Sequence, residues 1–392
     1  MPADPTTRPA ALPSLTGLRF IAAILVFFFH ITLSNSPVPP NSAVDPFADE
    51  GLAGSLEWLF GKAGYLGVSF FFVLSGFVLT WSSRQGEPMR AFWRRRMLKI
   101  FPNHLVMFVL AMVLFAGAIT EPTTWLANVF LLHSFSPDAT VYVSVNPPAW
   151  TLCSELLFYL LFPLIIKPIR RIAENRLWLW GAVMVVGMVA LQMVTQYLIP
   201  DSPKSPITPV STTQLWFGYI FPPGRLFEFV LGMIVARVVI AGIWPRIGIL
   251  PATASLVAGY AVALNVPFLY SFTVAMILPI CAVIGAFAVA DLRGERTGMQ
   301  GRKAVWLGEI SFGFYICQGV VIFYGRTLFP TSPFDTPLAF GVVAILFTAT
   351  LLSGWALYAL VEHPVMRRWA RKRPPRLVEV TTPPIQARST TD

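Results

Sequence analysis

The sequence has few charged residues. Asp, Glu, Lys and Arg make up 12% of its 392 residues, whereas hydrophobic residues make up 55%. Soluble globular domains carry about 25% charged residues, so this composition excludes an ordinary soluble protein and indicates an integral membrane protein. The chain also lacks a polar segment long enough for a second soluble domain, which needs about 100 residues.

Other features are missing as well. The three cysteines, Cys153, Cys281 and Cys317, all fall in apolar runs, so we expect packing residues rather than disulfides or nucleophiles. No metal site is expected. The chain shows no repeat of fixed period, which disfavours transporter folds built from inverted repeats. The first apolar run has no small-residue cleavage site after it, so we expect a span rather than a cleavable signal peptide.

Long apolar runs are abundant. We expect an all-α integral membrane protein with about ten transmembrane helices, because a run of roughly 20 apolar residues can cross a bilayer as a helix. Residues 15–370 should form one ten-span domain, between a polar segment at 1–14 and a disordered basic and polar tail at 371–392. Segment 123–135 is too short to cross and should lie near the interface. The predicted spans lie at about 15–34, 64–82, 101–120, 149–166, 177–199, 224–241, 249–266, 271–290, 304–325 and 337–361.

Positive charge is distributed unevenly between the loops. The net charge of +10 comes mainly from the loops after even-numbered spans and from the tail, whereas the intervening loops hold more acidic residues. Positive loops remain in the cytoplasm, so we expect both termini there. The same distribution gives no single basic face for nucleic acid. Examples of the basic residues are Arg90, Arg94, Lys167, Arg170, Arg296, Lys303 and Arg371.

The first apolar run contains two ionisable residues, Arg19 and His30. They stand eleven positions apart, which on an α-helix is about 20° more than three full turns and a rise of about 16 Å. One face of this span should therefore present a cation near the cytoplasmic end and an imidazole toward the outer end, a spacing that fits an extended ligand. Alternatively, Arg19 reaches the lipid headgroups and His30 makes a packing hydrogen bond.

Further ionisable residues fall in later spans. Glu155 stands within "PPAWTLCSELLFYLLFP", and Arg225 and Glu228 open the sixth predicted span. With alternating crossings these groups and His30 all fall in the middle or outer half of the membrane, where they could converge on a site. The alternative for Arg225 and Glu228 is a local ion pair at a helix start.

The stretch "FWRRRMLKIFP", at 92–102, gathers Arg94, Arg95, Arg96 and Lys99. Clustered arginines suit phosphate groups, so this stretch could bind a phosphorylated cofactor. Equally, these residues could serve only to keep a loop in the cytoplasm.

Taken together, these segments resemble the membrane-bound acyltransferase family 3, whose members transfer acyl groups from acyl-CoA to hydroxyls, commonly of sugars. The resemblance covers roughly residues 12–370, with Arg19, His30 and Glu155 at matching positions. Two departures stand out: Leu156 and Leu157 replace a glutamate and a glutamine of the family, and Gln318 stands where a histidine is frequent. The segments are "LTGLRFIAAILVFFFH", "GYLGVSFFFVLSGFVLT", "RRRMLKIFP", "AWTLCSELLFYLLFP", "RLFEFVLGM" and "YALVEHP".

The resemblance implies roles for the ionisable residues. A thioester has a good leaving group, so the essential element is a base for the acceptor hydroxyl, and we expect that base to be His30. Glu155 would orient the imidazole or the acceptor. Arg225, paired with Glu228, would stabilise the oxyanion or bind the acceptor. Acyl-CoA would be held by Arg19, Arg95, Arg96 and Lys99.

Two functions other than catalysis stay open. A proton-coupled secondary transporter or flippase could use His30, Glu155 and Glu228 as a proton relay. A non-catalytic scaffold is a further alternative, although it would not need these ionisable residues. For an enzyme, the acyl donor would be acetyl-CoA or another short-chain acyl-CoA. The acceptor would be a cell-surface glycan or a glycosylated natural product such as a macrolide, and the location a bacterial plasma membrane.

Overall fold

A computed structural model describes residues 9, 11–39, 41–84, 86–205, 208–271 and 273–370. The predicted tail, 371–392, and most of the segment 1–14 lie outside these residues. The described part is all-helical apart from two isolated β-bridges, Phe47 to Phe334 and Lys204 to Ser211. The predicted all-α class is therefore confirmed.

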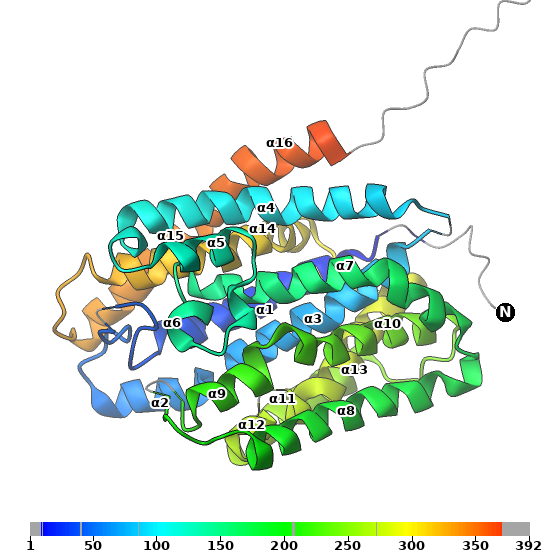
Figure 1. The fold of residues 1–392 in the computed structure, drawn as a ribbon. Helices are drawn as coiled ribbons and strands as arrows, with labels where there is room; N and C mark the ends of the chain where they lie inside the picture. The colour runs from blue at the N-terminus through cyan, green and yellow to red at the C-terminus, as the bar shows by residue number, and fades with distance from the viewer. Residues whose placement is uncertain are drawn as a thin grey trace, which may run out of the picture.

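The long helices run side by side between two ends of the molecule (Figure 1). Eight helical segments of the described chain are long and apolar enough to cross a membrane, and the protein is a multi-pass membrane protein. Two predicted spans coincide with shorter apolar helices, α10 (Leu226–Ile240) and α11 (Ile249–Asn265). The eight segments contain α1 (Pro13–Ile31), α3 (Ala63–Ser82), α4 (Met89–Leu114), α7 (Trp150–Arg171), α8 (Leu177–Leu198), α13 (Val274–Arg293), α14 (Arg302–Gln318) and α15 (Thr336–Leu357).

Short helices occupy the connections. α5 (Pro122–Val129) and the 3₁₀ turn His133–Phe135 make up most of the segment 123–135 that was predicted not to cross. The chain continues as a π-helix directly after α14 and directly after α15. The short α-helices are α2 (Glu50–Phe60), α5 (Pro122–Val129), α6 (Ala139–Tyr142), α9 (Thr212–Leu215), α12 (Phe268–Ser271) and α16 (His363–Val365). The π-helical turns are Trp216–Ile220, Gly319–Tyr324, Tyr358–Glu362 and Met366–Ala370.

Helix α4 begins earlier than the sequence suggested. It starts at Met89 rather than near 101, so the arginine-rich stretch is helical and continues into the apolar part of α4. Pro102 lies inside this helix. A proline removes one backbone donor and bends a helix, but neighbouring helices can hold such a bend in place. The arginines are therefore presented from a helix and not from a loop.

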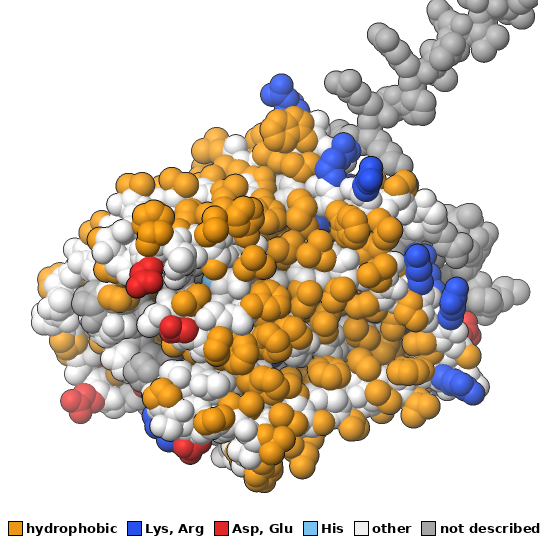
Figure 2. Space-filling model, in the orientation of Figure 1, with side chains coloured by type: hydrophobic (Ala, Val, Ile, Leu, Met, Phe, Trp, Pro, Cys, Tyr) orange, Lys and Arg blue, Asp and Glu red, His pale blue; other side chains and the backbone are white. Residues whose placement is uncertain are grey.

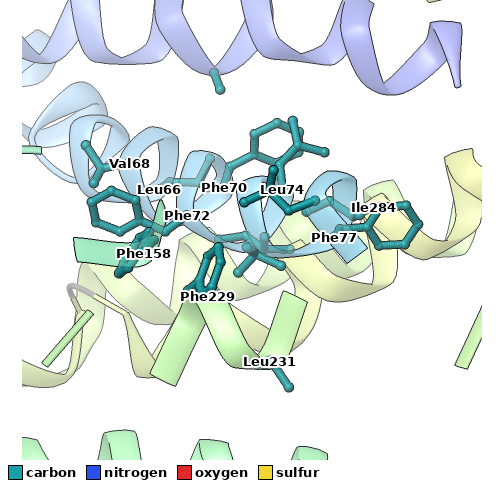
Figure 3. Packing of buried hydrophobic residues seen from close by; sticks show 14 of the residues in the cluster. Leu66, Val68, Phe70, Phe72, Leu74, Phe77, Phe158, Phe229, Leu231 and Ile284 are labelled. Atoms are coloured by element: carbon teal, nitrogen blue, oxygen red, sulfur yellow. The ribbon is translucent and has the colours of Figure 1, made fainter. Parts of the chain in front are cut away.

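Helix α3 is the centre of the bundle and packs against α1, α7, α10 and α13. It is apolar around its whole circumference, as expected of a helix enclosed by other helices. Figure 3 shows Phe72 of α3 beside Phe158 of α7 and Phe229 of α10. The latter two rings are stacked with centroids 4.6 Å apart.

The contact between α3 and α10 depends on two glycines. A Cβ added to Gly76 would overlap the carbonyl oxygen of Phe229, and one added to Gly232 would overlap that of Val73. Small residues at such crossings let two backbones approach closely, which is how helices commonly associate within membranes. This crossing holds α10, and with it Arg225 and Glu228, against α3.

The two ends of the bundle differ in charge. Figure 2 shows Lys and Arg gathered at the end where the chain begins, most visible Asp and Glu at the other end, and a hydrophobic band between them. We call these the basic end and the acidic end. The basic end includes the connections around Arg84 and Lys303, and the acidic end those around Asp49 and Asp138. Large hydrophobic side chains are exposed on the apolar helices, among them Val113, Leu198 and Leu250.

Candidate active site

A cavity of about 340 Å³ lies at the acidic end, and His30 is part of its wall. His30 comes from the last turn of α1, beside α2, α3 and the π-helical turn that follows α14. Aromatic rings make much of the lining, and Glu57 and Lys62 supply its charges. The aromatic residues are Phe29, Trp58, Tyr65, Trp150, Tyr219, Phe268, Tyr315 and Phe323.

The imidazole of His30 has a defined partner. Its Nδ1 lies 2.7 Å from Oε1 of Gln318, the last residue of α14. The same amide donates from Nε2 to the carbonyl oxygen of Ala23, at 3.3 Å. His30 is therefore hydrogen-bonded by Gln318, the residue that departs from the family pattern, and not by Glu155.

A second cavity, of about 30 Å³, lies in the middle of the bundle. Arg19 of α1 and Glu155 of α7 both line it. Oε2 of Glu155 accepts a hydrogen bond from the hydroxyl of Tyr159, at 3.1 Å. Val68 and Tyr315 line this central cavity and also the acidic-end cavity, so these two side chains stand between the two spaces. Arg19 and His30, which the sequence predicted to share one face of α1, thus line different cavities, the central and the acidic-end one.

Arg225 and Glu228 form a buried ion pair. Nη2 of Arg225 lies 2.6 Å from Oε2 of Glu228, and both side chains are almost fully enclosed. The Arg225 guanidinium packs on the rings of Tyr219 and Phe72, 4.7 and 5.2 Å from their centroids. Since Tyr219 lines the acidic-end cavity and Phe72 the central one, the pair stands directly behind the walls of both cavities. The local ion pair left open by the sequence is present.

A third cavity, of about 500 Å³, lies at the basic end, and Arg84, Arg95 and Arg96 line it. Arg95 is paired with Glu87, which lines the same cavity. The guanidinium of Arg96 stands 5.5 Å from the centroid of the Tyr159 ring, whose hydroxyl reaches Glu155. Arg96 therefore links the basic-end cavity to the residues around the central one.

Lys99 is not among the residues that line the basic-end cavity. Its Nζ lies 3.0 Å from Oε1 of Glu362, in the π-helical turn after α15. Asn103 donates to Oε2 of the same carboxylate, also at 3.0 Å. Of the four basic residues predicted to hold a phosphorylated donor, Arg95 and Arg96 thus line the basic-end cavity, Arg19 lines the central cavity, and Lys99 holds a buried carboxylate.

Three site residues were not singled out from the sequence, Tyr159, Tyr315 and Glu362, and Gln318 was noted only as a departure from the family. Tyr159 could have been found, because it follows Glu155 by four positions on a helix. The hydroxyl of Tyr315 donates to the carbonyl oxygen of Pro148, at 3.1 Å, a contact between distant segments that leaves no local signal. Gln318 and Glu362 likewise reach partners far away in the chain.

A further pair of histidines is buried near Cys153. His104 bonds the carbonyl oxygen of Asn128 through Nε2, at 2.8 Å, and Sγ of Cys153 lies 3.5 Å from Nδ1 of His133. Burial lowers the pKa of His133 to about 3, so this ring is neutral at physiological pH. Across the described ranges, no cluster of three or more His, Cys, Asp or Glu is arranged to hold a metal ion. The three cysteines are free and buried.

Comparison with known proteins shows that the chain is similar to acyltransferases. A family model described as an acyltransferase domain matches residues 12–359. Acyltransferase MdmB of Streptomyces mycarofaciens is 35% identical over 380 residues, covering 94% of this chain and 95% of the relative. Peptidoglycan O-acetyltransferase OatA of Listeria monocytogenes is 23% identical, with 79% of this chain and 49% of the relative covered. O-acetyltransferase OatA of Staphylococcus aureus is 22% identical, with 92% and 58% covered. The chain thus spans about half the length of the two OatA proteins. No solved structure matches it significantly.

Proposed function

The chain belongs to the membrane-bound acyltransferase family 3, and from this premise we propose that it moves an acyl group from acyl-CoA to a hydroxyl of a sugar-containing acceptor. That the protein is an acyltransferase follows from its family. The proposal adds the donor, the class of acceptor, and the residues that act. One observation carries it: cavities lie at the basic end, in the middle and at the acidic end of the bundle, and each holds residues suited to one part of the reaction.

The basic-end cavity would take the phosphates of CoA. Arg95 and Arg96 present guanidinium groups that pair well with phosphate oxygens. The pantetheine arm would then extend past Arg19 and Glu155 in the central cavity toward His30. The central cavity has room for only about one or two water molecules. Tyr315 and Val68 must therefore shift to let the arm through. Lys99 would act mainly on Glu362 and not on the phosphates.

The reaction would take place in the acidic-end cavity. The acceptor oxygen attacks the thioester carbonyl carbon while His30 accepts the hydroxyl proton. An ester C–O bond forms, the C–S bond breaks, and the proton passes from the imidazolium to the CoA thiolate. Glu155 would act from the central cavity by hydrogen bonding the substrate. Arg225 and Glu228 would hold Tyr219 in the cavity wall, with Arg225 available to the developing oxyanion only if that ring moves.

The acceptor would bind against aromatic rings at the acidic end. Flat rings with polar tips, such as those of Trp58, Tyr65 and Tyr219, suit ligands with both apolar faces and hydroxyls. A sugar has both, which fits a glycosylated natural product such as a macrolide or a cell-surface glycan. The Listeria relative, a peptidoglycan O-acetyltransferase, supports the second option. Acetyl-CoA or another short-chain acyl-CoA would be the donor, and no nucleic acid is required.

The proposed topology has ten spans in a bacterial plasma membrane, with both termini in the cytoplasm. The ten helices that coincide with predicted spans alternate in direction between the two ends, α10 and α11 included. Positive residues gather at the end where α1 begins, as retention in the cytoplasm requires. Residues 15–370 would be the ten-span domain. CoA would reach Arg95 from the cytoplasm, and the acceptor would reach His30 from outside.

The test uses the purified full chain in lipid nanodiscs with radiolabelled acetyl-CoA and a panel of glycosides. We expect a labelled ester on at least one glycoside and an equal amount of free CoA, both lost in the His30→Ala variant. Arg246→Gln, at an exposed basic-end position outside the cavities described above, is the control. Proton-coupled movement of a glycoside across the bilayer, without any ester from this panel or from longer acyl donors, would contradict the proposal and support a transporter.

A further inference from the structure

Gln318 makes the contact on which this inference depends. Its side chain is fully buried, and it hydrogen-bonds His30 of α1, 288 positions earlier in the chain. A glutamine has no charge and cannot act as an acid or a base near neutral pH. We infer that Gln318 is a positioning residue, which fixes the His30 imidazole in the tautomer that leaves Nε2 free to accept the proton of the acceptor hydroxyl. This inference rests on the proposed function, in which His30 is the base.

The orientation of the Gln318 amide follows from its second contact. The carbonyl oxygen of Ala23 can only accept a hydrogen bond, so the amide atom that faces it must be the NH₂ group. The amide oxygen then faces His30, at 2.7 Å from Nδ1. A flipped amide would set two acceptor oxygens against each other in a buried place, which is costly.

The tautomer follows from the amide orientation. Because Oε1 of Gln318 can only accept, the hydrogen of a neutral His30 ring must be on Nδ1. Nε2 then carries the lone pair, and no residue in the described part of the chain hydrogen-bonds it. Since His30 lines the acidic-end cavity, this nitrogen is left for a ligand there. In the Ser-His-Asp triad a buried carboxylate holds the same tautomer, and here an amide does so.

The backbone around Gln318 explains why the side chain stays in place. α14 ends at this residue, and the chain continues as a π-helical turn from Gly319. A Cβ at Gly319 would overlap Oδ1 of Asn146, and Nδ2 of Asn146 donates to the carbonyl oxygen of Ile316, at 3.1 Å. π-helical turns inside longer helices are often found at functional sites. The turn and Asn146 together lock the amide of Gln318 beside α1.

The consequence for catalysis is specific. When His30 takes the hydroxyl proton it becomes an imidazolium, and its Nδ1–H bond to the amide oxygen grows stronger because the donor is then charged. Gln318 thus helps most after the proton has moved, so its loss should lower kcat more than it raises KM. The proton itself goes from the acceptor oxygen to Nε2 and then to the CoA thiolate, and Gln318 neither gains nor loses one.

Two substitutions separate this role from simple packing. Gln318→Met keeps a similar volume and removes the acceptor, so we expect kcat to fall about 10- to 100-fold with KM for donor and acceptor changed less than about 3-fold. Gln318→Glu restores an acceptor with a charge, so it should recover most of kcat. Its carboxylate would favour the protonated ring and move the acidic limb of the pH profile to higher pH. The other ionisable groups around this cavity are unchanged in both variants: Glu57, Lys62, Tyr65, Tyr219 and Tyr315.

The tautomer can also be observed without activity. The chain has four histidines, so ¹⁵N-histidine labelling gives few signals, and the signal missing from His30→Ala identifies His30. We expect hydrogen on Nδ1 in the unmodified protein and a shift toward Nε2 in Gln318→Met. Gln300→Met, which removes an amide that accepts from Thr297 at the basic end, should change neither kinetics nor this signal.

The outcomes distinguish a failure of the proposed function from a failure of the role given to Gln318. If His30→Ala keeps its acyl transfer, the proposed function fails, and the inference with it. If His30→Ala is inactive while Gln318→Met keeps the kcat, pH profile and ¹⁵N signal of the unmodified protein, only the role of Gln318 is wrong. A His30 signal that shows hydrogen on Nε2 in the unmodified protein would also overturn that role.

Discussion

The Lys99 ammonium lies 3.0 Å from the Glu362 carboxylate, although 263 positions separate them in the chain. Glu362 is almost completely buried, and Asn103 completes its hydrogen bonds. The pair ties α4, which also carries Arg95 and Arg96, to the helical segment that follows α15. The sequence suggested Lys99 as a phosphate contact because of the arginines beside it. In the structure its ammonium instead joins two helical segments.

Removing the Lys99 charge should lower the stability of the protein more than it weakens substrate binding. Lys99→Met leaves a buried carboxylate unpaired, and we expect the free energy of unfolding to fall by about 2 kcal/mol, because Lys99 is partly exposed and the full cost of a buried pair is not reached. Thermal unfolding in detergent measures the loss. The double variant Lys99→Met with Glu362→Gln should regain most of it, whereas a rise in the KM for acyl-CoA without loss of stability would return Lys99 to the donor site.

The two arginines of the basic-end cavity should act on donor binding. Arg95→Gln with Arg96→Gln is expected to raise the KM for acyl-CoA about 10-fold or more while kcat changes little, because in the proposed function these side chains would hold the phosphates far from the reacting atoms. Steady-state kinetics over a range of acyl-CoA concentrations provides the measurement. Arg246→Gln serves as the control for loss of one positive charge at the same end. Unchanged CoA affinity in a folded, inserted double variant would mean that these arginines only set topology.

Glu87 provides a complementary test of the same cavity. It pairs with Arg95, so it competes with phosphate for that guanidinium. Glu87→Gln should therefore lower the KM for acyl-CoA, or leave it unchanged, and should not lower kcat. A marked increase in KM would show that the ion pair, rather than the free arginine, is needed for binding.

His30 and Arg19 should show opposite effects. His30→Ala is expected to reduce transfer by about 100-fold to 10,000-fold with acyl-CoA binding nearly intact, the range typical of general-base catalysis. Arg19→Ala should mainly weaken donor binding. Activity of the unmodified protein should fall as pH is lowered, because a protonated imidazole cannot accept the hydroxyl proton. Calorimetric titration with a non-transferable acyl-CoA analogue, beside rate measurements, separates binding from catalysis. An effect of only a few-fold at His30 would be too small for a base.

The topology has its own test. Reporter fusions after Arg96 and Lys303 should report the cytoplasm, and fusions near Asp49 and Asp138 should report the outside, because of the difference in charge between the two ends. A cytoplasmic signal near Asp49 would reverse the direction of α1 and place His30 on the cytoplasmic side.

His133 should make the fold sensitive to acid. Its pKa is about 3 in the folded protein and about 6.5 when unfolded, so below pH 6.5 the unfolded chain binds a proton that the folded chain does not. The contribution of this group to stability is therefore full above pH 6.5 and is lost progressively as pH falls toward the pKa of the folded protein. Unfolding of the detergent-solubilised protein between pH 7.5 and 5 measures the slope. His133→Asn should flatten it, and an unchanged slope would assign the acid sensitivity to other groups.

The sequence by itself determined the features that depend on local periodicity. Apolar runs of sufficient length predicted the helices, and the turn of an α-helix placed Arg19 and His30 on one face. The three-residue spacing of Arg225 and Glu228 indicated an ion pair that is indeed present. Each of these depends only on residues within one helix, so no knowledge of neighbouring helices was needed.

Only the tertiary structure decided which distant residues meet. Gln318 was noted as a departure without a titratable group, and its contact with His30 comes from the crossing of α14 and α1. Lys99 was placed with Arg95 and Arg96, yet it lies about one turn further along α4, where the segment after α15 packs against this helix and brings Glu362 within reach of its ammonium. Which helices cross, and where, depends on packing at contacts such as Gly76 against Phe229. Such packing joins segments far apart in the chain, and a single sequence contains no periodic signal for it.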